Sequence, residues 1–316
     1  GPDATSVIAS PRAGTCHECG GDVLPDGFCG VCGQRARAPR DHWVEAPVPW
    51  LAGVCDKGIA HARNEDALAL AGVADGSFAA LVVCDGVTTA PDSDRASLAA
   101  AREACAVLAA TSPAPGDGVA AVVSHWSRAL QLACAEANAE VVGVARALGD
   151  PPEPPSCTFV AAVQATRVLT VAWCGDSRAY WVPDDGAAAL LTLDHSLGTE
   201  MIRAGTSRLE AERDPAFHTI TRWLGADSHD ASPDVVSRVL DDAGWVVLCS
   251  DGLWNYASEP DALAERVRHC AAEQPNTPAD VAARLVAWAN DQGGHDNITV
   301  ALSRVERSVQ LPAEEG

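Results

Sequence analysis

Two short apolar runs in this sequence each end in an Asp-Gly pair. The pairs are Asp85-Gly86 and Asp251-Gly252, and a third acidic motif, Asp296-Asn297, stands directly before another apolar run. Apolar runs bounded by Gly and Asp are typical of buried strands, so each would place one carboxylate where the backbone leaves the core. One Asp-Gly pair alone is more often a turn. Three such carboxylates together indicate a site for a hard divalent cation.

A second group of chemically distinctive residues is a set of four clustered cysteines, Cys16, Cys19, Cys29 and Cys32, in the spacing Cys-x2-Cys-x9-Cys-x2-Cys. This is the pattern of a zinc ribbon; a redox disulfide pair or chance spacing is the alternative. A segment this short buries too little apolar surface to fold alone, so bound Zn²⁺ would order it. Four thiolates leave no open coordination position, so we expect a structural zinc site that docks a partner.

Composition limits the partners and the compartment. The chain has 316 residues, 22 basic and 43 acidic, with a net charge of −21, which argues against nucleic acid or an anionic membrane as partner. No apolar window reaches the length of a membrane span, and no signal pattern begins the chain. The scattered cysteines, eight of the twelve, suit a reducing compartment. We therefore expect a cytoplasmic protein.

The elements that must position these residues alternate in blocks. We expect a zinc ribbon over residues 13–36, a Pro-containing linker over 37–50, a main domain over 51–306 and a tail over 307–316. Helical composition covers 94–111, 118–148, 260–270 and 278–291, with Thr277 suited to an N-cap. Strand patterns cover 157–163, 168–174, 179–182, 235–240, 246–249 and 298–302. Helix pairs interleaved with strand blocks predict packed sheets covered by helices.

Further short motifs accompany these three acidic motifs in a fixed order. They are Asn64-Glu65-Asp66, Ser156-Cys157-Thr158, Gly175-Asp176-Ser177, Asp194-His195, and Ile220-Thr221-Arg222-Trp223-Leu224-Gly225. Each is weak alone, but together, over residues 53–304, the chain resembles the PPM (type 2C) metal-dependent serine/threonine protein phosphatases of bacterial type. The resemblance implies an α+β fold, a four-layer α-β-β-α sandwich of two antiparallel sheets flanked by helices.

The resemblance also implies a two-metal site. Asp85 would bridge two Mn²⁺ or Mg²⁺ ions, the carbonyl of Gly86 would bind one of them, and Asp251 and Asp296 would hold the other. Glu65 and Asp66 would act through metal-bound water or support the ligands. Such ions activate a water for in-line attack on phosphorus, without a covalent phosphoenzyme. The implied substrates are phosphorylated proteins, either substrates of a serine/threonine kinase or a kinase itself.

A third, weaker metal in this family is held by an acidic residue before the Ser-x-Thr stretch, for which Asp150 and Glu153 are the candidates here. Asp176 and Asp194-His195 also match family motifs, and we interpret them as turn or packing residues near the site. Residues 198–218 resemble the flap that bacterial members carry over the site. Their charged composition indicates a solvated loop and helix that influences substrate choice.

The sequence departs from the family at the residue that grips phosphate. The family has an arginine five positions before Asp66, where this chain has His61. If this segment is a strand, Arg63 faces the same side roughly 6.6 Å further along and could supply the guanidinium. His61 could instead contact phosphate as an imidazolium, or both could simply decorate a strand edge. No histidine follows Asp85 closely, so the leaving alkoxide would take its proton from metal-bound water or His61.

Three functions fit these residues. The leading one is a phosphoprotein phosphatase with a docking zinc ribbon. The His61 substitution keeps open a pseudophosphatase or adaptor that binds phosphoproteins or a kinase without turnover. A phosphatase of small-molecule phosphates would use the same ligands, so the sequence does not separate it from the first.

Overall fold

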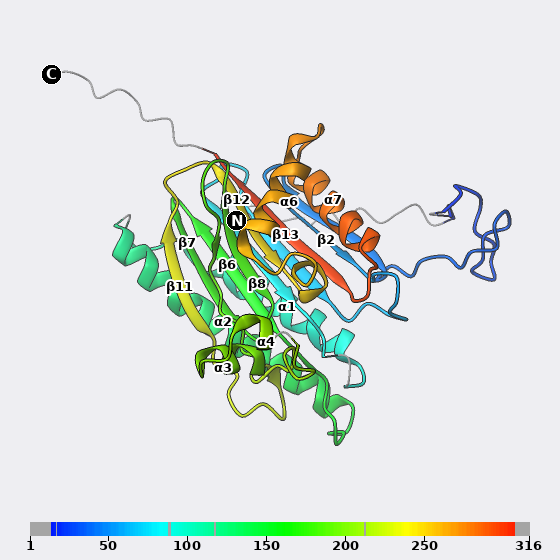
Figure 1. Ribbon diagram of the computed structural model, residues 1–316, viewed down its shortest axis with the longest axis horizontal. Coiled ribbons are helices and arrows are strands. Elements are labelled where there is room, and N and C mark those ends of the chain that lie inside the picture. Colours follow the sequence, from blue (N-terminus) through cyan, green and yellow to red (C-terminus); the bar gives the residue numbers. More distant parts are fainter. Residues whose placement is uncertain (1–13, 17, 88–89, 117, 212, 307–316) are drawn as a thin grey trace.

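The structure, a computed structural model, describes residues 14–306 apart from residues 17, 88, 89, 117 and 212. The predicted tail at 307–316 lies outside the described residues, as do Thr88 and Thr89 after the first Asp-Gly pair. Figure 1 shows a main body of sheets and helices, with the cysteine-bearing head to one side of it, joined by the segment that leads into the first strand.

Two antiparallel sheets form the centre of the body. The first sheet has the strand order β1 (His42–Val48), β2 (Leu51–Asp56), β13 (Ile298–Val305), β12 (Gly244–Cys249), β8 (Arg178–Pro183), β9 (Ala189–Leu190). The second has the order β11 (Asp234–Val239), β7 (Val168–Cys174), β6 (Phe159–Ala165), β4 (Phe78–Cys84), β3 (Ala67–Gly72). A two-residue pair joins β5 (Ser156–Cys157) to β10 (Leu224–Gly225).

Helices cover both outer faces of the sheets (Figure 1). The second sheet is covered by α1 (Ser93–Ala110) and α2 (Val119–Ala147), and the first by α6 (Pro260–Ala272) and α7 (Pro278–Asp291), with the short α5 (Asp251–Trp254) beside them. Two further short helices, α3 (Leu197–Arg203) and α4 (Arg208–Ala211), lie within the segment that resembles a flap. The result is the predicted α+β arrangement of two antiparallel sheets flanked by helices.

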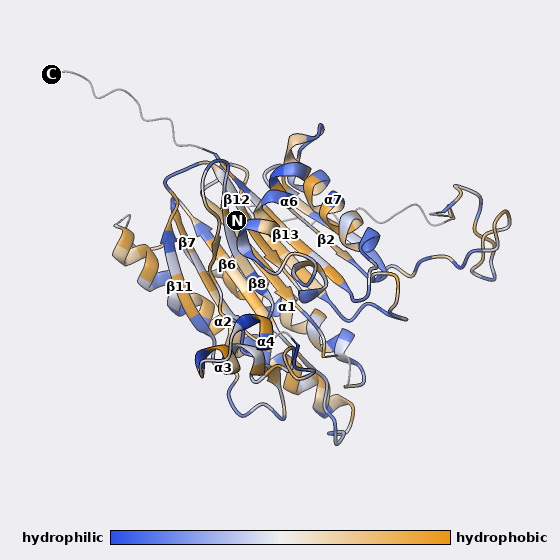
Figure 2. Cartoon of the chain, in the orientation of Figure 1, coloured by the Kyte–Doolittle hydropathy of each residue, from blue (hydrophilic) through white to orange (hydrophobic). Residues whose placement is uncertain are grey.

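Three hydrophobic cores separate the layers. One lies between the sheets and includes Leu81, Val171 and Leu248, and the other two lie between each sheet and its helices. Strands such as β4, β6 and β12 are therefore buried on both faces, which explains their uninterrupted apolar sequences. Figure 2 shows the hydrophobic residues running along β6, β8 and β13.

Several predicted elements are confirmed closely. The helix at α7 has the predicted bounds, and Thr277 caps it: Asp280 N–H donates to the Thr277 side chain while the Asp280 side chain accepts from the Thr277 backbone. The strand β7 also has the predicted bounds. The predicted strand at 157–163 is interrupted at Thr158, because that residue leaves the ladder to bond the backbone of Asp85.

The predicted linker differs from the structure over part of its length. Residues His42–Val48 form β1, the edge strand of the first sheet, with His42 opposite Asp56 and Val44 opposite Val54. Pro47 suggested a linker, but its position coincides with a register shift between Glu45 and Val48. Edge strands tolerate proline at such irregularities because one side of the strand needs no ladder hydrogen bond.

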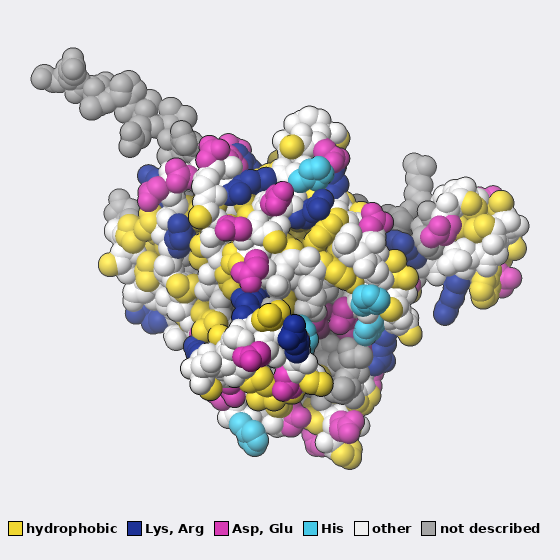
Figure 3. All heavy atoms as spheres, in the orientation of Figure 1, with side chains coloured by type: hydrophobic (Ala, Val, Ile, Leu, Met, Phe, Trp, Pro, Cys, Tyr) yellow, Lys and Arg dark blue, Asp and Glu magenta, His cyan; other side chains and the backbone are white. Residues whose placement is uncertain are grey.

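The surface carries charges of both signs. On the face shown in Figure 3, basic side chains are scattered among acidic ones. Of the described helices, none combines the length and apolar character that a bilayer span requires.

Candidate active site

The three acidic motifs come from neighbouring strand ends. Asp85 follows β4 in the second sheet, whereas Asp251 opens α5 directly after β12 and Asp296 precedes β13 in the first sheet. Thr158 fixes the end of β4, since Asp85 N–H donates to Thr158 Oγ1 at 3.0 Å and Thr158 N–H donates to the Asp85 carbonyl at 2.7 Å. The packing of the two sheets thus brings the three carboxylates to one end of the sandwich.

Glycine follows two of these aspartates because other backbone lies against it. A Cβ on Gly86 would come within 2.6 Å of the Glu65 carbonyl oxygen, and a Cβ on Gly252 within 2.0 Å of the Asn297 carbonyl oxygen. Both distances are shorter than any real Cβ contact. The Asp-Gly pairs therefore mark places where distant loops pack backbone to backbone, in addition to any role in turning the chain.

The carboxyl groups raise one another's pKa. Burial raises the pKa of Asp85 well above its usual range, and the charges of Asp66, Asp251 and Asp296 raise it further. Burial and the charge of Asp296 raise the pKa of Asp251 to about 6, although hydrogen bonds to Asp85 and Asn255 oppose the shift. Surplus negative charge at one place is the condition that a bound cation relieves.

Two carboxylate oxygens in this cluster are buried without a hydrogen-bond partner: Asp66 Oδ1 and Asp251 Oδ1. Their sister oxygens are bonded, Asp251 Oδ2 by Asn255 Nδ2 at 3.0 Å and Asp66 Oδ2 by Ser250 Oγ at 2.7 Å. Buried acceptors rarely stay unpaired, and oxygen ligands suit Mn²⁺ or Mg²⁺. The donor set therefore fits hard divalent cations.

The carboxylates of this cluster are not drawn together around one point. Within the described part of the chain, no three of their ligand atoms lie within 4.8 Å of one another. Oxygen atoms that share one Mn²⁺ or Mg²⁺ ion, with bonds of about 2.1 Å, lie at most about 4.2 Å apart. Binding of an ion would therefore draw these carboxylates closer together.

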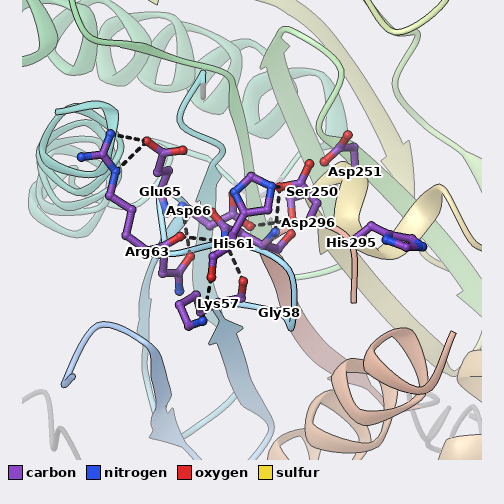
Figure 4. Close-up of polar contacts among 12 residues, drawn as sticks. Lys57, Gly58, His61, Arg63, Glu65, Asp66, Ser250, Asp251, His295 and Asp296 are labelled. Atoms are coloured by element: carbon purple, nitrogen blue, oxygen red, sulfur yellow. Dashed lines mark hydrogen bonds and ion pairs between the residues drawn. The ribbon is translucent and has the colours of Figure 1, made fainter. Parts of the chain in front are cut away.

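His61 and Arg63 lie in a loop between β2 and β3, not in a strand, so the alternation argument that placed them on one face does not apply. His61 Nε2 lies 3.3 Å from Asp296 Oδ1. Arg63 instead binds Glu65, with Nη2 and Nε 2.9 and 3.0 Å from Glu65 Oε1. Figure 4 shows His61 beside Asp296, whereas the Arg63 guanidinium extends to the far side of the cluster with Glu65.

The His61 loop is fixed by several polar contacts. Lys57, the only lysine in the sequence, donates from Nζ to the His61 carbonyl at 2.7 Å. Asn297 Nδ2 donates to the carbonyls of Lys57 and Arg63 at 2.7 and 3.1 Å. The backbone N–H groups of Ile59 and Ala60 both donate to the Gly294 carbonyl. His61 therefore sits on a loop tied to the segment that carries Asp296.

Asp176 lies near the cluster, where the sequence interpretation placed it as a turn or packing residue. It follows β7 and is buried, and burial together with the charges of Asp251 and Asp194 raises its pKa well above its usual range. Trp254 Nε1 donates to its carbonyl at 3.0 Å. The sequence did contain the signal, because Gly175-Asp176 ends an apolar strand as the Asp-Gly pairs do.

Asp194 has a packing role, as interpreted. It forms a buried ion pair with Arg178, whose Nη2 lies 2.7 Å from Asp194 Oδ2, and the Arg178 guanidinium lies 3.6 Å from the Trp254 ring centroid. His195 donates and accepts elsewhere, with Nδ1 accepting from Gly175 N–H at 3.1 Å. Asp150 and Glu153, the candidates for a third metal, are exposed in the loop after α2.

The four cysteines of the head converge. Their Sγ atoms lie within 4.8 Å of one another, with Cys16 and Cys32 at 3.6 Å and Cys19 and Cys29 at 3.5 Å. Tetrahedral zinc with Zn–S bonds of 2.3 Å sets sulfur atoms about 3.8 Å apart, so the cluster has suitable dimensions. Hydrogen bonds from the Cys32 and Val31 backbone lower the pKa of Cys29 to about 6. Despite a backbone hydrogen bond from Gln34, contacts with the other thiols raise the pKa of Cys32 to about 12, so Cys29 ionises first.

The chain is similar in sequence to known proteins. A family model described as protein phosphatase 2C matches residues 59–290. The serine/threonine phosphatase stp of Listeria innocua is 35% identical over 153 residues, which are 48% of this chain and 57% of that protein. This chain thus aligns with little more than half of that relative.

Solved structures are similar over a longer stretch. The serine/threonine phosphatase PstP/Ppp of Mycobacterium tuberculosis superposes with a TM-score of 0.64 at 26% identity, covering 81% of this chain and 98% of that one. The PPM Ser-Thr phosphatase MsPP of Mycobacterium smegmatis superposes with a TM-score of 0.59 at 30% identity, covering 82% and 98%.

Proposed function

Because the chain belongs to the protein phosphatase 2C family, we propose that it is a metal-dependent phosphatase of phosphoserine and phosphothreonine in proteins. The observation that carries this proposal is the meeting of Asp85, Asp251 and Asp296 at one end of the sandwich, with a buried, unpartnered oxygen on Asp251. The sequence resemblance assigned these same residues to the metal site.

In this proposal the chain holds two Mn²⁺ or Mg²⁺ ions through Asp85, the Gly86 carbonyl, Asp251 and Asp296. Bound there, the ions supply the positive charge that makes water a nucleophile near neutral pH and stabilises the phosphoryl group during attack. The unpartnered Oδ1 of Asp66 contributes negative charge to the site. Hydrogen bonds from Ser250 and from the other partners of Asp66 fix the orientation of its carboxylate. The structure offers no comparable support for a third ion at Asp150 or Glu153.

His61 is the better placed of the two phosphate-binding candidates. Its imidazole lies beside Asp296, whereas Arg63 is engaged with Glu65 on the far side of the cluster (Figure 4). In the proposed reaction, His61 Nε2, which faces Asp296 Oδ1 at 3.3 Å, turns from that carboxylate to donate a hydrogen bond to a phosphoryl oxygen or to return a proton to the leaving alkoxide. The Glu65 side chain then holds the Arg63 guanidinium, and the backbone hydrogen bonds of Glu65 hold its own segment in place.

We further propose that residues 14–36 bind one structural zinc ion through Cys16, Cys19, Cys29 and Cys32. The head carries exposed apolar side chains, Leu24, Phe28 and Val31, which suit contact with a protein partner. Phosphoprotein substrates, a cognate kinase as partner and a cytoplasmic location stay predictions that follow from the family and the composition.

The test of the phosphatase proposal is phosphate release from a phosphothreonine peptide. We expect the full chain, freed of metals and reloaded with Mn²⁺, to turn over this peptide. Asp251→Asn should lower kcat/KM by roughly 100-fold or more, because it removes a charge at the reacting centre. The metal-free variant should be at least as stable as the wild type at pH 8, since a buried like charge is removed.

Asp241→Asn is the matched control, because Asp241 is exposed and pairs only with Arg167 in the described structure. It should keep full activity. If the folded, Mn²⁺-loaded wild type binds phosphopeptide without releasing phosphate, the protein is an adaptor and the phosphatase proposal is wrong. Turnover of small phosphate esters alone would assign a small-molecule substrate instead.

A further inference from the structure

The segment Asn64-Glu65-Asp66 connects all three loops that carry the metal-site aspartates. The Glu65 carbonyl accepts from Gly86 N–H at 3.2 Å, which ties it to the Asp85 loop. Glu65 N–H donates to Asn297 Oδ1 at 2.7 Å, which ties it to the Asp296 loop. Asp66 Oδ2 accepts from Ser250 Oγ at 2.7 Å, next to Asp251. The position of this segment therefore sets the relative positions of the three aspartates.

Arg40 binds this segment from outside the family-matched region. Its Nη2 donates to the Asp66 carbonyl at 2.7 Å and to the Asn64 carbonyl at 3.3 Å. Asn64 Nδ2 donates in return to the Arg40 carbonyl at 3.0 Å. The guanidinium also lies 5.2 Å from the Trp43 ring centroid, a distance at which a cation is attracted to an aromatic face.

The short stretch that contains Arg40 is docked on the body rather than loose. Lys57 N–H donates to the Asp41 carbonyl at 2.8 Å, and His42 Nδ1 lies 2.7 Å from Asp56 Oδ2. Arg37 lies 3.8 Å from the same Asp56 carboxylate. These contacts hold Arg40 against the Asn64–Asp66 segment, because they fix the backbone on both sides of it.

We propose that Arg40 is a positioning residue of the metal site. It binds two carbonyls of the segment that joins the three aspartate loops, and so keeps the aspartates at the spacing that the ions require. The inference rests on the proposed function, but its geometry involves no residue that touches substrate. It also makes the stretch just after the cysteine head a working part of the catalytic body.

The experiment compares Arg40→Ala, Arg40→Lys and Arg167→Ala in the full chain. Arg167→Ala is the matched control, since its half-exposed side chain contacts the Leu240 carbonyl and Asp241 and, in the described structure, no residue of 64–66. We expect Arg40→Ala to weaken Mn²⁺ binding, measured by calorimetry on metal-free protein, by roughly 10- to 100-fold, as is usual for residues that orient metal ligands. Arg40→Lys should recover part of this loss, because an ammonium can donate to both carbonyls, as Arg40 Nη2 does, but stands on a shorter side chain.

Hydrogen exchange provides a readout independent of turnover. In metal-free Arg40→Ala, the amide of Glu65 should exchange faster, while the amide of Leu81 in the core should not change. Mn²⁺ affinity and Glu65 exchange equal to those of the wild type would overturn the proposal, as would a rise in exchange that is equal at Leu81. If the wild type binds Mn²⁺ but has no phosphatase activity, the proposed function is contradicted. The comparison of Mn²⁺ affinity and Glu65 exchange among the variants still tests the role of Arg40 in that case.

Discussion

At the position of His61 the family resemblance predicts a phosphate-gripping arginine, and the surroundings of His61 define what this residue can do instead. It lies against Asp296, and its loop is held by Lys57 and Asn297. Arg63 could replace the missing arginine only by leaving Glu65, which it binds through two nitrogens. Both nitrogens contact the same oxygen, Glu65 Oε1, and the Arg63 side chain is half-exposed, so solvent weakens this ion pair.

At the residue scale we therefore predict unequal effects of two alanine variants. His61→Ala should lower kcat/KM for a phosphothreonine peptide by roughly 10- to 100-fold, since a hydrogen bond to a charged group contributes about 1.5–3 kcal/mol. Arg63→Ala should lower it less. Steady-state kinetics at saturating Mn²⁺ measures both. The reverse order would show that Arg63 leaves Glu65 to bind the phosphate.

A side chain of β1, in the first sheet, binds a backbone donor at the edge of the second sheet. β3 is an edge strand of the second sheet, and its Leu70 N–H donates to Glu45 Oε2 of β1 at 3.0 Å. The carboxylate thus occupies a donor that would otherwise remain open on the edge. Burial raises the pKa of Glu45 to about 7, against opposing contributions from the Leu70 hydrogen bond and Arg102.

At the element scale this predicts a pH-dependent effect of Glu45→Gln. A carboxyl with a folded pKa near 7 and an unfolded value near 4.5 stabilises the fold fully only below the lower value, and this stability is lost as pH rises toward 7. Gln keeps the acceptor but has no charge. In urea unfolding of metal-free protein, the free energy of unfolding of Glu45→Gln should rise relative to that of the wild type by about 1–3 kcal/mol between pH 4 and pH 8.

Glu210 gives a control of opposite sign. Hydrogen bonds from Ser207 lower its pKa, so its contribution to stability is present above the unfolded pKa and is lost on acidification. Glu210→Gln should therefore be less stable than the wild type at pH 7, with a difference that shrinks toward acid pH. If Glu45→Gln and Glu210→Gln vary with pH in the same sense, the burial of Glu45 is not the cause.

The described chain has two parts: a head with four clustered cysteines and a body with three hydrophobic cores. The residues that join them pack on the body. The body has separate cores between the sheets and under each helical layer. Among the described residues of the head, Cys16 and Cys29 are the buried apolar side chains. A segment with so few buried apolar side chains would depend on the proposed zinc ion for order, whereas the body has cores of its own.

At this scale we predict that zinc removal separates the two parts. The double variant Cys29→Ser, Cys32→Ser should bind no zinc and lose hydrogen-exchange protection over residues 18–33, while its Mn²⁺-dependent activity stays unchanged. Elemental analysis and exchange mass spectrometry measure this. Cys105→Ser, a substitution in α1, should keep one zinc per chain. Loss of activity in the double variant would show that the head acts on the site through the Arg40 stretch.

The sequence by itself determined the elements whose signal is local. Continuous apolar strands, the Thr277 cap of α7, the Asp-Gly strand ends and the cysteine spacing all depend on residues close together in the chain. It did not predict β1, because Pro47 indicated a linker and the strand is defined only by its pairing with β2. The sequence also placed His61 and Arg63 on one face, which required a strand that the loop does not form.

Only the tertiary structure decided which loops meet. Glu65 and Asn297 are 232 residues apart in the chain, yet their hydrogen bond ties the Asn64–Asp66 segment to the Asp296 loop. The approach of Asp176 to Asp251, the pairing of Arg63 with Glu65 and the contact of Arg40 with Asn64 and Asp66 are of the same kind. Local pattern carries no information about such contacts, because they form only when two sheets and their covering helices pack together.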